Sequence, residues 1–211
     1  MITSEERKRP LSIGSVPTPV YLAFGDLGVD SIAFVDHLPK PDEKLFVEPG
    51  GDFSGGMMGN AAATVAALGV SAGVVALLGD DDRGDLVADE LESRGVDLRF
   101  VRRISAPTFW TLSLTTPEGD RALVQFPTPA FEADWEGYDR RIVAAAKWVH
   151  TTAEQGGPVG ELLGEAHGTN GVKTSLDTEY PFVEREDLGD LLQLTDVAFI
   201  NRAAAHALGG D

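Results

Sequence analysis

The residues with the clearest chemical potential follow a short apolar run near the start of the chain. The run "VYLAFG", residues 20–25, predicts a buried strand, and Asp26 and Asp30 come just after it. Ligands bind at the carboxyl ends of strands in open parallel sheets, where a carboxylate can accept hydrogen bonds from two neighbouring hydroxyl groups. Asp30 is therefore a candidate ligand for a polyol, although either aspartate could instead cap a turn.

A glycine-rich stretch supplies the second candidate. The stretch "FSGGMMGNAAATVAALG" places Gly55, Gly56 and Asn60 directly before an alanine-rich run that predicts a helix over 61–68. Paired glycines favour a tight turn with exposed backbone N–H groups, and Asn60 offers both a donor and an acceptor. Neutral donors and acceptors suit a sugar hydroxyl. Asn60 could also be an ordinary N-cap, but an N-cap does not explain the glycine pair.

Several common sites are not encoded. The glycines after the first strand lack the spacing of G-x-G-x-x-G, and no G-x-x-x-x-G-K-[ST] occurs, so neither a Rossmann fingerprint nor a P-loop is predicted. The chain has no cysteine, and its four histidines are scattered without metal-ligand spacing. The acidic segment "GDDDRGD", residues 79–85, lacks the spacing of a calcium loop and is interpreted as a turn between a strand and a helix. We therefore predict no metal site from these residues.

Charge and composition restrict the partners. The 211 residues include 17 basic and 34 acidic side chains, a net charge of -17, which argues against binding to nucleic acid or to anionic membranes. Residues 1–19 carry charges, Ser and Pro without an apolar core, so we expect a flexible extension, no signal peptide and a cytoplasmic protein. The uncharged stretch 61–78 is interrupted by "GVSAG", which favours a helix, a turn and a strand over a membrane span.

Strand-like and helix-like segments alternate along most of the chain. We expect further strands over 72–78, 147–151, 171–176 and 197–200, and helices over 83–94, 139–146, 159–167 and 185–192. This order predicts a mostly parallel sheet with helices on both faces. Two regions fall outside the alternation: half-exposed strands at 32–35 and 44–47, and a hairpin of 109–115 and 122–126. Both look antiparallel and predict a small separate sheet.

Taken together, these blocks resemble the ribokinase-like sugar kinases of the PfkB family. "AFGDLGVDSIAFVDHLPKPDE" is similar to that family's opening strand, substrate aspartate and first lid segment, and "SGGMMGNAAATVAALG" to its first signature. "PTFWTLSLTTPEGDRALVQF" resembles its second lid hairpin, and the match covers residues 20–211, the N-terminal two-thirds of a member. The resemblance implies an α/β three-layer sandwich with a mostly parallel central sheet. It also implies a small β-sheet lid, built from segments at about 31–50 and 107–127.

The resemblance assigns roles to single residues. The substrate-binding set that it implies is Asp30, Gly55, Gly56, Asn60 and Glu154. Asn201 corresponds to the Asn of an N-x-x-E motif in the phosphate and magnesium region, but Ala204 replaces its Glu. Met57 and Gly28 replace the Lys and Asn of ribokinases proper, so ribose is not assured. The second signature, G-A-G-D, with the catalytic base, belongs beyond Asp211, so we expect no catalytic residue within this sequence.

The activity implied by the resemblance is ATP-dependent phosphorylation of a hydroxymethyl group on a sugar or sugar-like polyol, with ATP and Mg²⁺ as cofactors. Two alternatives stay open: a nucleoside kinase of the same family, and a catalytically inactive sugar-binding or dimerising remnant. A dinucleotide oxidoreductase is disfavoured because the fingerprint is missing. Lid hairpins with open edges favour pairing with a second lid, so we expect a homodimer.

Overall fold

The body of the protein is built on a parallel sheet. The computed structural model describes residues 17–156, 158–180 and 182–209. Six strands form this sheet: β1 (Tyr21–Phe24), β4 (Ala72–Gly79), β5 (Val101–Ile104), β8 (Trp148–Thr152), β9 (Lys173–Thr178) and β10 (Val197–Ile200). Their order is β10-β9-β8-β1-β4-β5, and every neighbouring pair is parallel. The predicted alternation of strands and helices is therefore confirmed.

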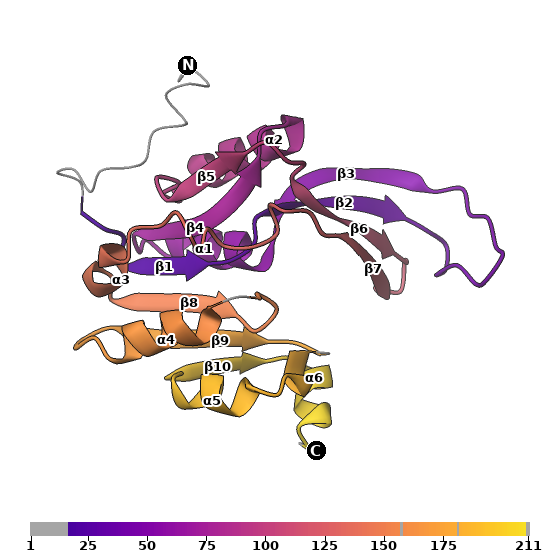
Figure 1. Ribbon diagram of the computed structural model, residues 1–211. Coiled ribbons are helices and arrows are strands. Elements are labelled where there is room, and N and C mark those ends of the chain that lie inside the picture. The colour runs from indigo at the N-terminus through magenta and orange to yellow at the C-terminus, as the bar shows by residue number, and fades with distance from the viewer. Residues whose placement is uncertain (1–16, 157, 181, 210–211) are drawn as a thin grey trace.

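Helices cover both faces of this sheet. They are α1 (Met57–Ala67), α2 (Asp82–Ser93), α3 (Arg141–Ala145), α4 (Val159–His167), α5 (Leu188–Gln193) and α6 (Arg202–Ala207), with a 3-10 helix, η2 (Phe182–Glu184). Apolar side chains of α1 and α2 pack against β1 and β4, whereas α3 and α4 pack on the opposite face of β1 and β8. Figure 1 shows α4 and α5 in front of the sheet and α1 behind it. The three-layer α/β sandwich is thus confirmed.

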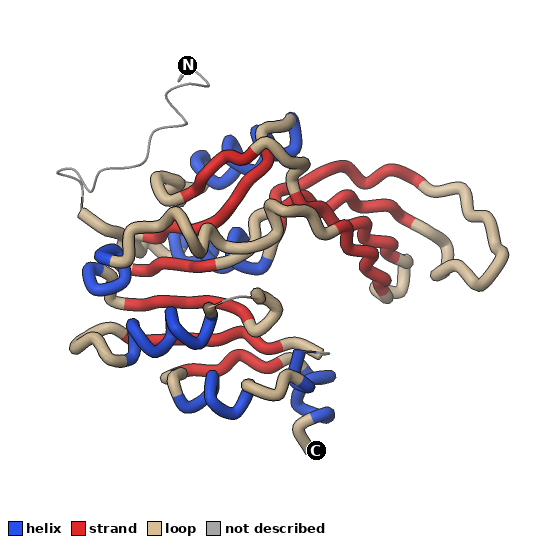
Figure 2. The backbone as a smooth tube through the Cα atoms, in the orientation of Figure 1, coloured by secondary structure: helices blue, strands red, loops and turns tan. Residues whose placement is uncertain are grey.

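A second, smaller sheet forms the lid. It contains β2 (Gly28–Phe34), β3 (Glu48–Gly55), β6 (Phe109–Thr115) and β7 (Arg121–Phe126), in the order β3-β2-β6-β7. Figure 2 shows these four strands projecting from one end of the body. The separate sheet was predicted, but one aspect of the prediction was wrong. The two regions of chain meet through β2 and β6, which are parallel, and only the outer pairs are antiparallel.

The strand predicted at 44–47 is also wrong, because these residues form a loop. Strand β2 ends at Phe34, whose partner on β3 is Glu48, so the residues before Glu48 have no strand to pair with. The loop contains a tight turn in which Asp42 has a φ of 63° and Glu43 accepts the backbone N–H of Lys40. The Gly- and Pro-rich stretch after the loop forms the edge strand, a position that tolerates Pro.

The helix predicted over 61–68 begins earlier, at Met57. The chain leaves β3 and turns directly into α1 at Gly56, whose φ of 88° is accessible to glycine. Residues 61–78 form part of α1 and most of β4, as predicted. Throughout the described ranges, every helix is too short or too polar to cross a membrane.

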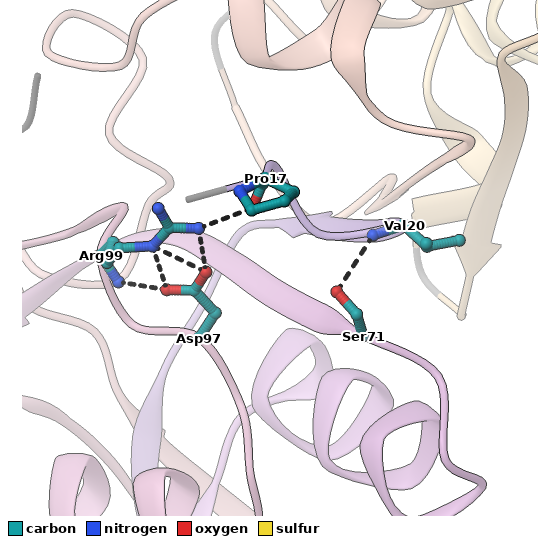
Figure 3. Close-up of polar contacts among 5 residues, drawn as sticks. All are labelled: Pro17, Val20, Ser71, Asp97 and Arg99. Atoms are coloured by element: carbon teal, nitrogen blue, oxygen red, sulfur yellow. Dashed lines mark hydrogen bonds and ion pairs between the residues drawn. The ribbon is translucent and has the colours of Figure 1, made fainter. Parts of the chain in front are cut away.

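The start of β1 is fixed at the amino ends of the strands, opposite the lid. The backbone N–H of Val20 donates to Ser71 Oγ at 3.3 Å, and the Arg99 guanidinium binds both Asp97 and the carbonyl of Pro17, as Figure 3 shows. These contacts join residues 17–20, which lead into β1, to the segments that lead into β4 and β5. Most of the predicted extension, residues 1–16, lies outside the described residues.

Candidate functional site

The predicted site residues lie where the carboxyl ends of the body strands meet the lid. In Figure 1 the arrowheads of β1, β8, β9 and β10 point toward the side from which the lid projects. The chain passes from β1 through Gly25 and Asp26 into lid strand β2, and Glu154 follows the end of β8, the neighbour of β1. This edge is the usual ligand site of an open parallel sheet.

Asp30 and Gly55 meet on adjacent lid strands. Asp30 pairs with Phe53 in the register of β2 and β3, and its carboxylate lies over Gly55. A Cβ atom on Gly55 would lie 2.4 Å from Asp30 Oδ2, so a larger residue there would displace the carboxylate. Burial raises the pKa of Asp30, and the positive charge of Arg121 on β7 opposes that rise. The Asp30 carboxylate is thus half-buried and packs directly against the backbone of Gly55.

Asp26 and Gly56 form the turn that joins strand β1, the lid and α1. A Cβ atom on Gly56 would lie 2.8 Å from the carbonyl oxygen of Asp26, and Asp26 Oδ2 accepts the backbone N–H of Met57 at 2.9 Å. The other carboxylate oxygen of Asp26 is buried without a hydrogen-bond partner in the described part of the chain. Burial raises the pKa of Asp26 to about 6 against the effect of its backbone hydrogen bonds. Asp26 thus ties the turn after β1 to the start of α1.

Glu154 faces the lid from the body. Burial and the negative charges of Asp26, Glu179 and Asp177 together raise its pKa to about 7, and burial contributes most. A hydrogen bond from Gln125, on lid strand β7, acts in the opposite direction. Glu154 therefore lies between the first strand of the body and the last strand of the lid.

Sequence reasoning missed Gln125, although a signal was present. Thr111 pairs with Asp30 on one side and with Gln125 on the other, so the three polar side chains form one row across the lid. The row could have been found by setting the hairpin 109–126 in register beside β2. That step required the parallel pairing of β2 and β6, which the sequence did not indicate.

The backbone N–H of Asn60 donates to the carbonyl of Gly56 at 3.0 Å, but the side chains of Asn60 and Asn201 make no hydrogen bond to this group among the described residues. Asn60 is in the first turn of α1, exposed, in a shallow groove with Ala63, Thr64 and Arg94. Its side chain makes no hydrogen bond to the other predicted site residues within the ranges that the structure describes. Asn201 follows β10, and its side-chain oxygen accepts the backbone N–H of Ala204 at 2.8 Å, which caps α6. The described contacts thus join Asp30 to Gly55 and Asp26 to Gly56, and the charge of Asp26 raises the pKa of Glu154.

The described residues offer no preformed cluster for a magnesium ion. No group of three or more His, Asp or Glu side chains among them is arranged to hold a metal. The Asn201 oxygen is already engaged as a helix cap, and Ala204 contributes only a methyl group. We therefore derive no chemical step through a metal at this site.

Comparison with known proteins agrees with this architecture. The sequence matches the pfkB family carbohydrate kinases over residues 21–211. The ATP-dependent ribose-1-phosphate kinase of Halopiger xanaduensis is 32% identical over 188 residues, which are 89% of this chain and 63% of that protein. The chain thus spans less than two thirds of this relative's length.

Solved structures share the fold. Ribokinase from Arabidopsis thaliana, in complex with ribose and ATP, has a TM-score of 0.71 at 24% identity and covers 90% of this chain and 62% of its own. Adenosine kinase from Sinorhizobium meliloti has a TM-score of 0.72 at 22% identity, covering 91% of this chain and 68% of its own. At these identities the two structures establish the fold alone. The match over residues 21–211 confirms the predicted resemblance: the chain belongs to the pfkB family of carbohydrate kinases.

Proposed function

We propose that the protein phosphorylates a hydroxymethyl group of a sugar with ATP, and that residues 17–209 form the sugar-binding side of its site. The observation that carries the proposal is the placement of Asp30 on the lid and Glu154 after β8, with Asp26 at the end of β1 close enough to interact electrostatically with both. ATP as the donor and a pentose as the acceptor are supported by a relative that is an ATP-dependent ribose-1-phosphate kinase.

The chemistry of these residues suits a polyol. The two oxygens of the Asp30 carboxylate accept hydrogen bonds from adjacent hydroxyl groups, and Gly55 leaves that carboxylate open to a close ligand. Phosphoryl transfer needs accurate positioning and exclusion of water more than covalent help from the protein. In this proposal the lid supplies both, because it carries Asp30 and extends beside the edge where the sugar would lie.

The cofactor and partner expectations follow from the same proposal. Mg²⁺ is proposed on the family resemblance alone, since the described residues supply no cluster for it. A homodimer through the lid is supported by exposed apolar side chains on its strands and tip loop: Phe34, Phe46, Val47, Leu123, Val124 and Phe126. Open strand edges with such side chains favour pairing with a second copy.

A coupled assay for ADP release tests the proposed activity. The protein is supplied with ATP, Mg²⁺ and one acceptor at a time: D-ribose, ribose 1-phosphate, D-fructose or adenosine. We expect acceptor-dependent ADP release with a sugar or sugar phosphate from protein that includes the G-A-G-D segment, since the resemblance places the catalytic base there. Release with adenosine alone would favour the nucleoside kinase. Sugar binding without ADP release would favour the sugar-binding protein that lacks catalysis.

A further inference from the structure

We propose that Glu90 on α2 is a positioning residue of the sugar site, acting through lid strand β3. Its side-chain Oε2 accepts the backbone N–H of Ser54 at 2.8 Å. Ser54 lies directly before Gly55, the residue against which the Asp30 carboxylate packs. The effect on sugar binding rests on the function proposed above, whereas the hydrogen bond stands independently of it.

The edge position of β3 explains why this strand needs an anchor. It is an outer strand of the lid and pairs only with β2. Residues along an antiparallel pair alternate between N–H groups that bond to the neighbouring strand and N–H groups that point away from it. Ser54, opposite Val29, has an N–H of the second kind, and the Glu90 carboxylate takes the place that a further strand would occupy.

A second carboxylate holds the other end of the glycine pair. The N–H of Met57 donates to Asp26 Oδ2 at 2.9 Å, so Gly55 and Gly56 lie between two amides that each donate to a carboxylate. Glycine has more backbone freedom than any other residue, and the two fixed amides restrict this stretch to one path past Asp30. A Cβ on Gly55 would lie 2.4 Å from Asp30 Oδ2, so even a small shift of β3 would move its backbone against that carboxylate.

The Glu90 side chain is itself held in place. Its other oxygen, Oε1, pairs with the guanidinium of Arg94, one turn later at the end of the same helix. The next residue, Leu91, is buried in the core that α1 and α2 form with the sheet. Asp81 caps the start of α2 by accepting the backbone N–H of Gly84 at 2.9 Å. A side chain on a capped and packed helix positions its partner more precisely than one on a loop.

Helix α2 also contacts the other half of the lid. Asp81 accepts the backbone N–H of Thr108, just before β6, at 3.0 Å. The Arg83 guanidinium lies 4.2 Å from the ring centroid of Trp110 on β6. Both halves of the lid are therefore attached to one helix of the body. The contact from Glu90 differs from the other two because it adjoins the candidate sugar-binding residues.

Loss of the hydrogen bond from Ser54 to Glu90 frees this part of β3 and lowers the population of the arrangement that binds sugar. The apparent affinity falls in proportion to that population. A hydrogen bond to a charged group is strong enough to change such a population about tenfold.

Substitution of Glu90 by Leu and by Gln tests the proposal. Leu removes the acceptor, whereas the amide oxygen of Gln can still accept the N–H of Ser54. Glu92→Leu is the matched control, because Glu92 is an exposed residue of the same helix. In amide NMR spectra we expect the proton signal of Ser54 to move upfield in Glu90→Leu, to move less in Glu90→Gln and to stay in place in Glu92→Leu. An unchanged Ser54 signal in folded Glu90→Leu would overturn the proposal.

Calorimetry with D-ribose, ribose 1-phosphate, D-fructose and adenosine separates the hydrogen bond from its role. The affinity for the sugar that binds wild type should fall about tenfold in Glu90→Leu, be largely restored in Glu90→Gln and be unchanged in Glu92→Leu. Equal affinity in wild type and Glu90→Leu would overturn the positioning role. If the Ser54 signal moves as expected but wild type binds none of the four compounds, the hydrogen bond stands and the proposed function fails, together with the role of Glu90 in it.

Discussion

Substitution of Asp26 by Asn removes a buried negative charge from the turn between β1 and the lid and keeps the shape of the side chain. The pKa of Asp26 rises from 3.8 to about 6 on folding, because the carboxylate is buried and one of its oxygens has no partner in the described part of the chain. A carboxyl group with a raised pKa stabilises the fold fully below its unfolded pKa. That contribution is lost as the pH rises through the folded pKa.

The size of the effect follows from the two pKa values. The full difference corresponds to about 3 kcal/mol of unfolding free energy, of which about 2 kcal/mol falls between roughly pH 4.5 and roughly pH 7.5. Asn is neutral at both values and can still accept the N–H of Met57 through its amide oxygen. The unfolding free energy of Asp26→Asn should therefore improve relative to wild type by about 2 kcal/mol over that pH range.

Urea unfolding followed by tryptophan fluorescence at the two pH values measures this difference directly. The same substitution at Asp89, an exposed residue of α2, controls for the removal of one negative charge from an acidic protein. A difference between Asp26→Asn and wild type that is the same at both pH values would refute the reasoning. It would mean that Asp26 is solvated or paired in the folded protein.

Three further perturbations test other parts of the structure. Gly56→Ala should lower the unfolding free energy by at least about 1 kcal/mol more than Gly69→Ala. Both glycines have a positive φ, but an added Cβ would meet Asp26 at Gly56 and would meet no atom at Gly69. Equal losses of unfolding free energy in the two variants, measured by urea unfolding, would contradict the close approach at Gly56. Arg83→Ala should cost about 0.5–1 kcal/mol and speed amide exchange in β6, whereas the exposed Arg202→Ala should do neither. Val124→Asp should convert a dimer to a monomer in light scattering while Leu208→Asp, an equally exposed control, should not; a monomeric wild type would contradict the lid dimer.

Patterns of short range were sufficient to predict much of the fold. The apolar run at β1, the stop at Gly25 and the turn around Asp81 depend on neighbouring residues, and the structure has them where the sequence placed them. Asp81 caps α2 by accepting the backbone N–H of Gly84, as the interpretation of the acidic segment as a turn requires. The existence of a separate lid sheet followed from strands that break the alternation.

Features that depend on pairing between distant segments could not be predicted. The parallel register of β2 and β6 decides which residues of the hairpin share a face with Asp30, and nothing local to either strand encodes it. The row of Asp30, Thr111 and Gln125 across the lid depends on that register. Likewise, the sequence alone indicates a turn residue at Asp26. The burial of its carboxylate and its hydrogen bond to Met57 depend on the packing of distant segments.

The binding of sugar against Asp30 is the central claim, and isothermal titration calorimetry tests it most directly. D-ribose, ribose 1-phosphate, D-fructose and adenosine are titrated into wild type, Asp30→Ala and Ser31→Ala. Ser31 is the matched control because it follows Asp30 on β2, points to the opposite face of the lid and donates to Asp52. We predict that a sugar binds wild type and Ser31→Ala alike and Asp30→Ala at least about tenfold more weakly. Equal affinity in Asp30→Ala, or no binding of any of the four to wild type, would contradict the claim.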